Sequence, residues 1–152
     1  MVGNPNPEGQ RTEMEVNYFG IIKMCDAFAP ILGANGGGDI LNILSVSGLS
    51  SFAFAPGYSA SKAAGRSLTQ ALRAELGKQG TLASGVFPGP VDTDIAKNVP
   101  MDKVSPDSVA VHVYEEIAKG YEDIYPDTFA VQFAVGAQAD IKALEKANAA
   151  VF

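Results

Sequence analysis

The chain has 152 residues, of which 47% are hydrophobic and 18% charged, and its formal net charge is −6. These values predict one globular domain over residues 1–152. The 11 lysines and arginines form no cluster, which argues against nucleic acid as a partner, and the acidic balance argues against binding to anionic membranes. No apolar run approaches the roughly 20 residues of a membrane span. The only cysteine, Cys25, excludes an internal disulfide, fits a cytoplasmic location and is predicted to lie in the core.

The first half of the chain predicts a helix followed by a buried strand. Residues 1–10 are polar and rich in proline and asparagine, which predicts a loop. Apolar residues at three- and four-residue spacings predict a helix over residues 12–32. Three successive glycines end this helix. The short apolar run over residues 39–45 then fits a strand buried on both faces, as in a parallel sheet.

The second half continues the alternation of helices and strands. The predicted elements are a helix over residues 58–78, a strand over 82–87, a loop over 94–104, a helix over 105–119, a short strand over 123–125 and a helix over 139–149. Ser105 and Pro106 are suitable N-cap and first-turn residues for the helix that they begin. Strands separated by helices predict an α/β fold with a parallel sheet, right-handed crossovers and helices on both faces.

Tyr58 and Lys62 form the first candidate for chemistry. They stand four residues apart at the start of a predicted helix, so both side chains lie on one face. A free tyrosine has a pKa near 10, and a neighbouring ammonium group favours the phenolate. A tyrosine held beside a lysine could therefore exchange a proton with a substrate hydroxyl or carbonyl group.

Two further polar residues are placed where this chemistry would need them. Ser45 ends the first predicted strand, 13 residues before Tyr58. Open α/β sheets bind ligands at such strand ends, where a hydroxyl group can stabilise an oxyanion. Ser47 competes for this role, but the strand-end position and the spacing favour Ser45. Asn17, inside the first predicted helix, could hold a water molecule that links Lys62 to solvent.

Four segments together resemble the short-chain dehydrogenase/reductase family. Three of them are Asn42–Gly48, Pro56–Ala64 and Pro88–Thr93, which occur in the family's order and at compatible spacing. The fourth, Glu15–Gly20, resembles the helix-borne asparagine motif of the family. The resemblance covers nearly the whole chain and implies a partial Rossmann-like, doubly wound parallel sheet.

The resemblance also implies an oxidoreductase that moves a hydride between NAD or NADP and a small carbonyl compound or secondary alcohol. It assigns proton transfer to Tyr58, and it assigns lowering of the Tyr58 pKa and binding of the nicotinamide ribose to Lys62. Ser45 would orient the substrate oxygen, and Asn17 would complete a proton relay. The residues along the nicotinamide end of the cofactor would be Tyr58, Lys62, Pro88, Gly89, Val91 and Thr93. No metal is expected, because the only histidine, His112, belongs to no metal-binding cluster.

One part of the family pattern has no counterpart in the sequence. A Gly-x-x-x-Gly-x-Gly turn between a strand and a helix is absent, and Gly33–Gly38 follows a helix and precedes a strand, the reverse order. Three interpretations follow: a truncated product or fragment, a chain completed by a partner, or a catalytically inactive remnant that acts as an interaction or assembly module. The strand over residues 39–45 would lack a neighbour, and the two long helices resemble the family's dimer interface. We therefore expect a homo-oligomer, either a dimer or a tetramer.

Two minor features complete the sequence-based expectations. Phe52, Phe54 and Met101 lie in predicted loops and indicate an apolar substrate pocket. A hydrolase that uses Ser45 or Ser59 is a distant alternative, because the sequence lacks a nucleophile elbow and a nearby histidine.

Overall fold

The computed structural model describes residues 6–149, so the part of the predicted loop at residues 1–5 lies outside the described residues. The helices and strands are α1 (Pro7–Met14), α2 (Gly20–Ala34), β1 (Gly38–Ile43), α3 (Pro56–Leu76), β2 (Thr81–Val86), α4 (Pro106–Ile117), β3 (Asp123–Ile124), α5 (Thr128–Ala139) and α6 (Ile141–Ala149). Every helix and strand predicted from the sequence is present, with ends displaced by a few residues. Helix α5 is the one element without a predicted counterpart.

The three strands form one parallel sheet in the order β1-β2-β3, which confirms the predicted α/β architecture. β1 and β2 pair along their whole length, from Gly38 opposite Thr81 to Ile43 opposite Val86. β3 pairs with the end of β2 only. The carboxyl ends of β1 and β2 therefore lie side by side, and the loops that follow them start from the same edge of the sheet.

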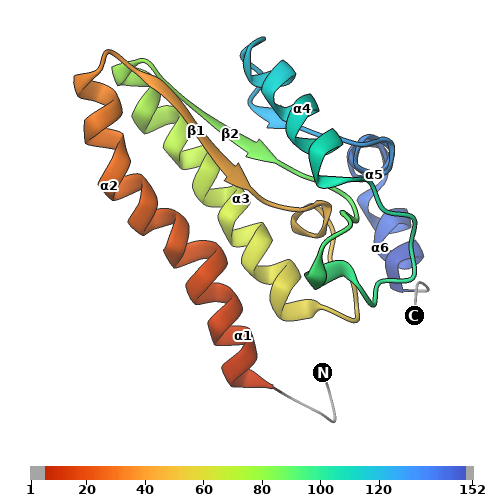
Figure 1. Cartoon of the computed structure of the whole chain (residues 1–152). Helices are drawn as coiled ribbons and strands as arrows, with labels where there is room; N and C mark the ends of the chain where they lie inside the picture. The colour runs from red at the N-terminus through yellow and green to blue at the C-terminus, as the bar shows by residue number, and fades with distance from the viewer. Residues whose placement is uncertain (1–5, 150–152) are drawn as a thin grey trace.

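Helices cover both faces of this sheet (Figure 1). On one face, Ile40 packs in a cluster with Leu72 of α3 and Cys25 of α2. Cys25 is 4% exposed, which confirms the prediction that it lies in the core. On the other face, Leu41 packs with Val113 of α4. Because adjacent residues of β1 point to opposite faces, the strand separates two small cores. This arrangement is the partial doubly wound fold expected from the sequence.

Helix α1 begins earlier than the sequence predicted. The side chain of Asn6 accepts a hydrogen bond from the Gly9 backbone N–H group at 3.0 Å, and Pro7 occupies the first helical position. Proline is favourable there because the first N–H groups of a helix have no partner within it. The prediction of a loop over residues 7–10 is therefore wrong. α1 continues through a π-helical turn, Glu15–Phe19, into α2 (Figure 1).

The turn between α2 and β1 requires glycine. Gly37 has a φ angle of 113°, and a Cβ atom there would lie 2.2 Å from the Gly80 carbonyl oxygen. A side chain would therefore force apart the two backbone segments that lead into β1 and β2. The three-glycine run places the starts of both strands next to each other.

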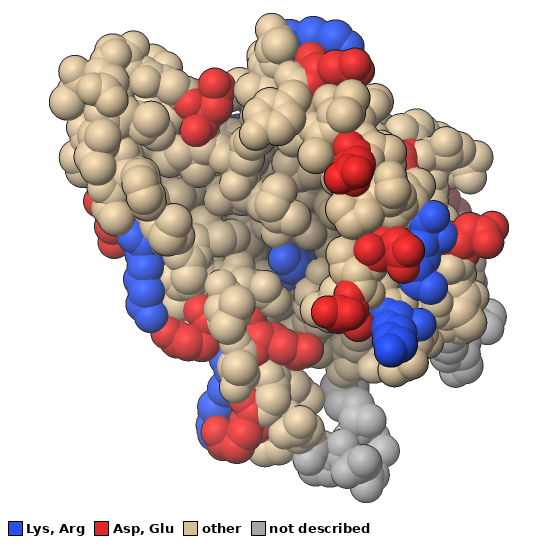
Figure 2. All heavy atoms as spheres, in the orientation of Figure 1, with Lys and Arg blue, Asp and Glu red and all other residues tan. Residues whose placement is uncertain are grey.

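β1 is more exposed than predicted, because the sequence indicated a strand buried on both faces. Ile43 is 57% exposed, whereas the side chains of β2 are almost all buried. Within the described residues β1 pairs with β2 alone, so its other edge is open. An open groove of about 450 Å³ runs between this edge and α2, and Met24 and Phe28 line it. Figure 2 shows few charged side chains over the C-terminal part of α2, at the upper left, whereas charged side chains lie along its N-terminal part.

The C-terminal helices pack against the loops that follow the strands. Phe133 of α5 contacts Phe52 and lies in a cluster with Val46 and Ala130. α5 is apolar around most of its circumference, so it lacks the one-sided pattern that identifies a surface helix. None of the described helices is both long and apolar enough to cross a lipid bilayer.

Candidate active site

The site is built at the carboxyl ends of β1 and β2. Ser45 lies two residues after β1, and Pro88 lies two residues after β2. The Val46 N–H group donates a hydrogen bond of 3.2 Å to the Pro88 carbonyl, which ties the two loops together. Ligands of open α/β sheets bind at such strand ends.

The start of α3 brings Tyr58 and Lys62 to this edge. α3 lies close to the loop after β1, because a Cβ atom at Gly48 would be 2.9 Å from the Lys62 carbonyl oxygen. The ammonium group of Lys62 donates a 2.8 Å hydrogen bond to the Ile43 carbonyl. It also lies 5.5 Å from the centre of the Tyr58 ring. The four-residue spacing therefore places both side chains at the end of β1, as predicted.

The structure places Ser45, and not its rival Ser47, against Tyr58. The side chains of Ser45 and Tyr58 form a hydrogen bond. Ser45 also accepts a hydrogen bond from the Ser47 backbone N–H group at 3.2 Å, which fixes the turn after β1. The Ser47 hydroxyl is buried, and among the described residues it has no hydrogen-bond partner. This geometry favours Ser45 as the hydroxyl that acts together with Tyr58.

Burial raises the pKa of the Tyr58 phenol above its ordinary value of 10. The hydrogen bond with Ser45 lowers this pKa, and the negative charge of Glu13 raises it further. Burial is the largest of these effects, so the Tyr58 pKa is raised overall, and the role of Lys62 in lowering it stays a prediction. The physical reason for the rise is that loss of hydration penalises the phenolate. Tyr58 is therefore protonated at neutral pH and can act as a proton donor.

Burial also lowers the pKa of the Lys62 ammonium group, from an ordinary value of 10.5 to about 8. Lys62 is only 8% exposed. Its charge is compensated by a neutral carbonyl group and an aromatic ring. A lysine in this condition remains largely protonated at pH 7 but loses its proton more easily than an exposed one.

Asn17 lies close to the site, and its described side-chain hydrogen bond goes to Ser61 and not to Lys62. It sits in the π-helical turn Glu15–Phe19, and its amide group donates a 3.0 Å hydrogen bond to the Ser61 hydroxyl. Ser61 in turn donates a 2.8 Å hydrogen bond to the Tyr58 carbonyl. Asn17 is thus linked to the backbone of Tyr58 through Ser61. π-Helical turns occur frequently at functional sites, which fits this position.

The segment after β2 borders the same edge. Pro88 is buried, while Gly89 and Val91 are half-buried. Val91 forms an isolated bridge with Val104, which closes the loop between them. Thr93 is exposed, and its hydroxyl donates a 3.3 Å hydrogen bond to the Val91 carbonyl. The four predicted cofactor-binding residues of this segment therefore lie in one loop, with Thr93 farthest from the strand.

Three residues that sequence reasoning missed also belong to this region. Glu13 of α1 lies against the start of α3, because a Cβ atom at Gly57 would be 2.3 Å from its Oε2 atom. Ser61 joins Asn17 to α3, and Asp127 joins the loop after β2 to α5. The N-cap preference of aspartate could have revealed Asp127, whereas no local signal points to Glu13.

Of the three apolar residues predicted to line a substrate pocket, Phe52 and Phe54 lie together, with their ring centres 5.5 Å apart. Phe52 is buried in the core cluster with Phe133, whereas Phe54 is 49% exposed. Met101 lines a groove of about 680 Å³ together with Phe129 of α5. The predicted pocket is therefore not formed by these three residues as a group. The described residues contain no group of histidine, cysteine and acidic side chains that could hold a metal ion.

An open parallel α/β sheet with serine, tyrosine and lysine side chains at its carboxyl edge defines a Rossmann-like oxidoreductase fold. Residues 5–104 match the family model described as short chain dehydrogenase. The chain therefore belongs to the short-chain dehydrogenase family of oxidoreductases. It is similar to mouse dehydrogenase/reductase SDR family member 7, with 34% identity over 93 residues that cover 60% of this chain and 28% of the relative. Mouse SDR family member 7B is 30% identical over 139 residues, covering 82% of this chain and 43% of that protein.

Solved structures show the same relationship. A short-chain dehydrogenase from Burkholderia cenocepacia J2315, in complex with NADP, is 38% identical and superposes with a TM-score of 0.89, covering 94% of this chain and 60% of that one. A short-chain dehydrogenase from Sphingobium yanoikuyae, in complex with NADPH, has the same fold at 24% identity and a TM-score of 0.74, covering 94% and 59% of the two chains. The present chain thus spans only part of the length of the relatives that it matches.

Proposed function

We propose that this chain carries the catalytic residues of an oxidoreductase that transfers a hydride between NAD or NADP and a small carbonyl compound or secondary alcohol. The observation that carries the proposal is the contact of Ser45, Tyr58 and Lys62 at the end of β1. The complex of the Burkholderia relative with NADP supports the choice of cofactor class. The single cysteine, which excludes an internal disulfide, supports a cytoplasmic location.

Each of these side chains has a distinct role in the proposed reduction. The Ser45 hydroxyl donates a hydrogen bond to the substrate carbonyl oxygen. The Tyr58 hydroxyl then gives its proton to that oxygen as the carbonyl carbon gains the hydride. The Lys62 ammonium stabilises the resulting phenolate, and Asn17 holds the backbone of Tyr58 in place through Ser61. In the oxidation of an alcohol, Tyr58 takes the proton back.

The residues present fit the nicotinamide end of the cofactor. Lys62 is a buried donor that could reach a ribose hydroxyl, and the backbone of Gly89 and Val91 borders the same edge. The bound cofactor would supply or accept the hydride. The sequence has no glycine-rich turn for the pyrophosphate group, so most of the affinity would have to come from other contacts.

Titration of the purified chain with NADH and NADPH by calorimetry tests this proposal. We expect saturable binding in the micromolar range, weakened at least tenfold in Lys62→Ala, because the substitution removes the only buried ammonium group at the described site. Lys142→Ala, on the exposed surface of α6, is the matched control and should bind like the wild type. Absence of saturation at millimolar concentrations of both cofactors would show that this chain is not an autonomous dehydrogenase.

A second candidate function is favoured by the open edge of β1. In this alternative the chain is an inactive member of the family that acts as an assembly module. The groove beside β1 is lined by exposed apolar side chains, among them Met24 and Phe28. Unpaired strand edges promote association with other chains. Self-association is compatible with both functions, whereas cofactor binding is expected only for the first.

We expect the chain to form dimers or larger homo-oligomers at micromolar concentrations. Phe28→Glu should weaken self-association at least tenfold, because it places a charge in the groove where apolar contacts would form. Val135→Glu makes the same change at an exposed position of α5, away from the groove, and should have no effect. Sedimentation velocity measures the self-association of the wild type and of both variants. A wild-type chain that remains monomeric at all micromolar concentrations would contradict this prediction.

A further inference from the structure

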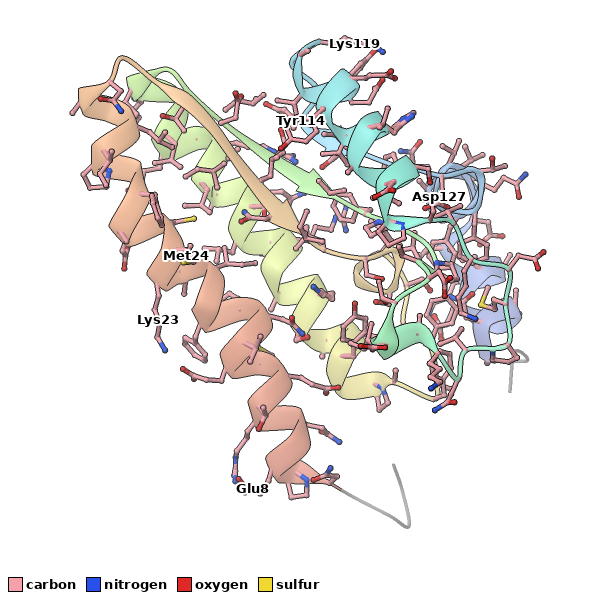
Figure 3. All side chains as sticks on the ribbon, in the orientation of Figure 1. Glu8, Lys23, Met24, Tyr114, Lys119 and Asp127 are labelled. Atoms are coloured by element: carbon pink, nitrogen blue, oxygen red, sulfur yellow. The ribbon has the colours of Figure 1, made fainter. Side chains whose placement is uncertain are left out.

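Asp127 connects the loop after β2 to the start of α5 (Figure 3). One carboxylate oxygen, Oδ2, accepts a 2.9 Å hydrogen bond from the Gly89 backbone N–H group. The other, Oδ1, accepts a 2.7 Å hydrogen bond from the Ala130 N–H group and so caps α5. The two oxygens of one side chain thus hold two separate segments of the fold.

The Gly89 N–H group is the only backbone donor in the sequence Pro88-Gly89-Pro90, because proline lacks an N–H group. The carbonyl groups on either side are also engaged. The Pro88 carbonyl accepts from Val46 N–H at 3.2 Å, and the Pro90 carbonyl accepts from Val104 N–H at 3.1 Å. The peptide between Pro88 and Gly89 is therefore held at its carbonyl by Val46 and at its N–H group by Asp127.

Close packing reinforces the contact. A Cβ atom at Gly89 would lie 2.7 Å from the Phe129 ring and 2.9 Å from Asp127 Oδ1. The loop consequently rests directly on the first turn of α5, at a distance that only glycine permits. A change at Asp127 would remove the hydrogen bond that ties this peptide to α5 and leave it held only at its carbonyl, by Val46.

We propose that Asp127 is a positioning residue that fixes the Pro88–Pro90 loop in the orientation needed to bind the nicotinamide end of the cofactor. The inference rests on the proposed function, because it gives this loop a ligand. Asp127 itself acts through Gly89 and not by contact with the cofactor. Helix α5, which follows Asp127, is thereby coupled to cofactor affinity.

Asp140 provides a matched comparison within the chain. It precedes α6, and a single oxygen, Oδ1, accepts hydrogen bonds of 3.0 Å from both Lys142 and Ala143 N–H groups. In the described structure the Asp140 side chain therefore only caps α6. Serine preserves N-capping but has only one short hydroxyl group. Asp127→Ser should therefore keep the cap of α5 and lose the bond to Gly89, whereas Asp140→Ser should keep its one function.

The experiment compares the wild type with Asp127→Ser and Asp140→Ser in two measurements. The first is the dissociation constant for NADPH and NADH, and the second is amide hydrogen exchange of Gly89 followed by NMR in the free protein. For Asp127→Ser we expect about tenfold weaker cofactor binding and clearly faster exchange at Gly89. For Asp140→Ser we expect wild-type values in both. Urea unfolding of the two variants shows whether their stabilities are similar.

The outcomes separate the two proposals. If the wild type binds cofactor and Asp127→Ser binds equally well, or if exchange at Gly89 is unchanged, the positioning role is overturned. If the wild type binds neither cofactor, the proposed function fails. In that case faster exchange at Gly89 in Asp127→Ser still supports the role of Asp127 in fixing the loop, and unchanged exchange overturns it.

Discussion

Replacing Tyr58 with phenylalanine is expected to lower the rate of ketone reduction about a thousandfold, which is typical for loss of a general acid. The substitution removes the hydroxyl that lies against Ser45 and that would give its proton to the substrate oxygen in the proposed reduction. The phenyl ring remains, so the contact between the Lys62 ammonium and the aromatic face is preserved. Because Tyr58 is also expected along the nicotinamide end of the cofactor, we expect affinity to fall, but less than in Lys62→Ala. The measurement is turnover of NADPH with a panel of ketones, combined with a titration of the cofactor.

Tyr114→Phe is the matched control for this experiment. Tyr114 lies on α4 and is 74% exposed, so loss of its hydroxyl should change neither rate nor affinity. A Tyr58→Phe variant with wild-type turnover would contradict the assignment of Tyr58 as the proton donor. A loss of cofactor binding in the same variant as large as that in Lys62→Ala would instead indicate that the main role of Tyr58 is to hold the cofactor.

Removal of the Lys62 ammonium should change how stability depends on pH. The pKa of Lys62 is about 8 in the folded chain and 10.5 ordinarily. Between these values the unfolded chain binds more protons, so the stability of the wild type rises with pH. Relative to Lys62→Met, the wild-type free energy of unfolding should increase by about 2 kcal/mol from roughly pH 7 to roughly pH 9.5. Urea unfolding at a series of pH values measures this difference.

The comparison between variants isolates Lys62 from other titrating groups. The raised pKa of Tyr58 makes the folded chain less stable above pH 10, but this contribution is present in both proteins and cancels. Lys142→Met removes an exposed lysine in the same way and should give no comparable trend. A difference between wild type and Lys62→Met that is independent of pH would mean that the ammonium is better hydrated than its burial indicates.

Local sequence patterns were sufficient to predict the sheet and the helices that cover it. The apolar runs at β1 and β2 and the four-residue spacing of Tyr58 and Lys62 are short-range signals. Helix α5 was missed because apolar residues surround it and give no one-sided pattern. The exposure of β1 was also missed, since it depends on which strands pair and not on the composition of β1.

Among the site residues, too, contacts that depend on nearby sequence could be predicted and contacts between distant elements could not. Ser45, Tyr58 and Lys62 could be predicted because the strand–helix connection fixes where they meet. The partner of Asn17 could not, because Ser61 reaches it across two helices that pack only in the folded chain. The rise of the Tyr58 pKa through burial could not be predicted either. The sequence reveals the neighbouring charge, whereas the degree of burial is a property of the whole fold.

The parallel pairing of β1 with β2 has a consequence for the order of folding. The two strands are joined through α3, so they cannot pair until this long helix has turned the chain back on itself. Contacts within α3 are local and can form early, whereas strand pairing requires closure of a long loop and is slow. The bond from Lys62 to the last carbonyl of β1 requires only that α3 packs on β1, so this part of the site can form before the two strands pair. Until β1 and β2 pair, both strands expose edges that can associate with other chains, so slow pairing favours aggregation.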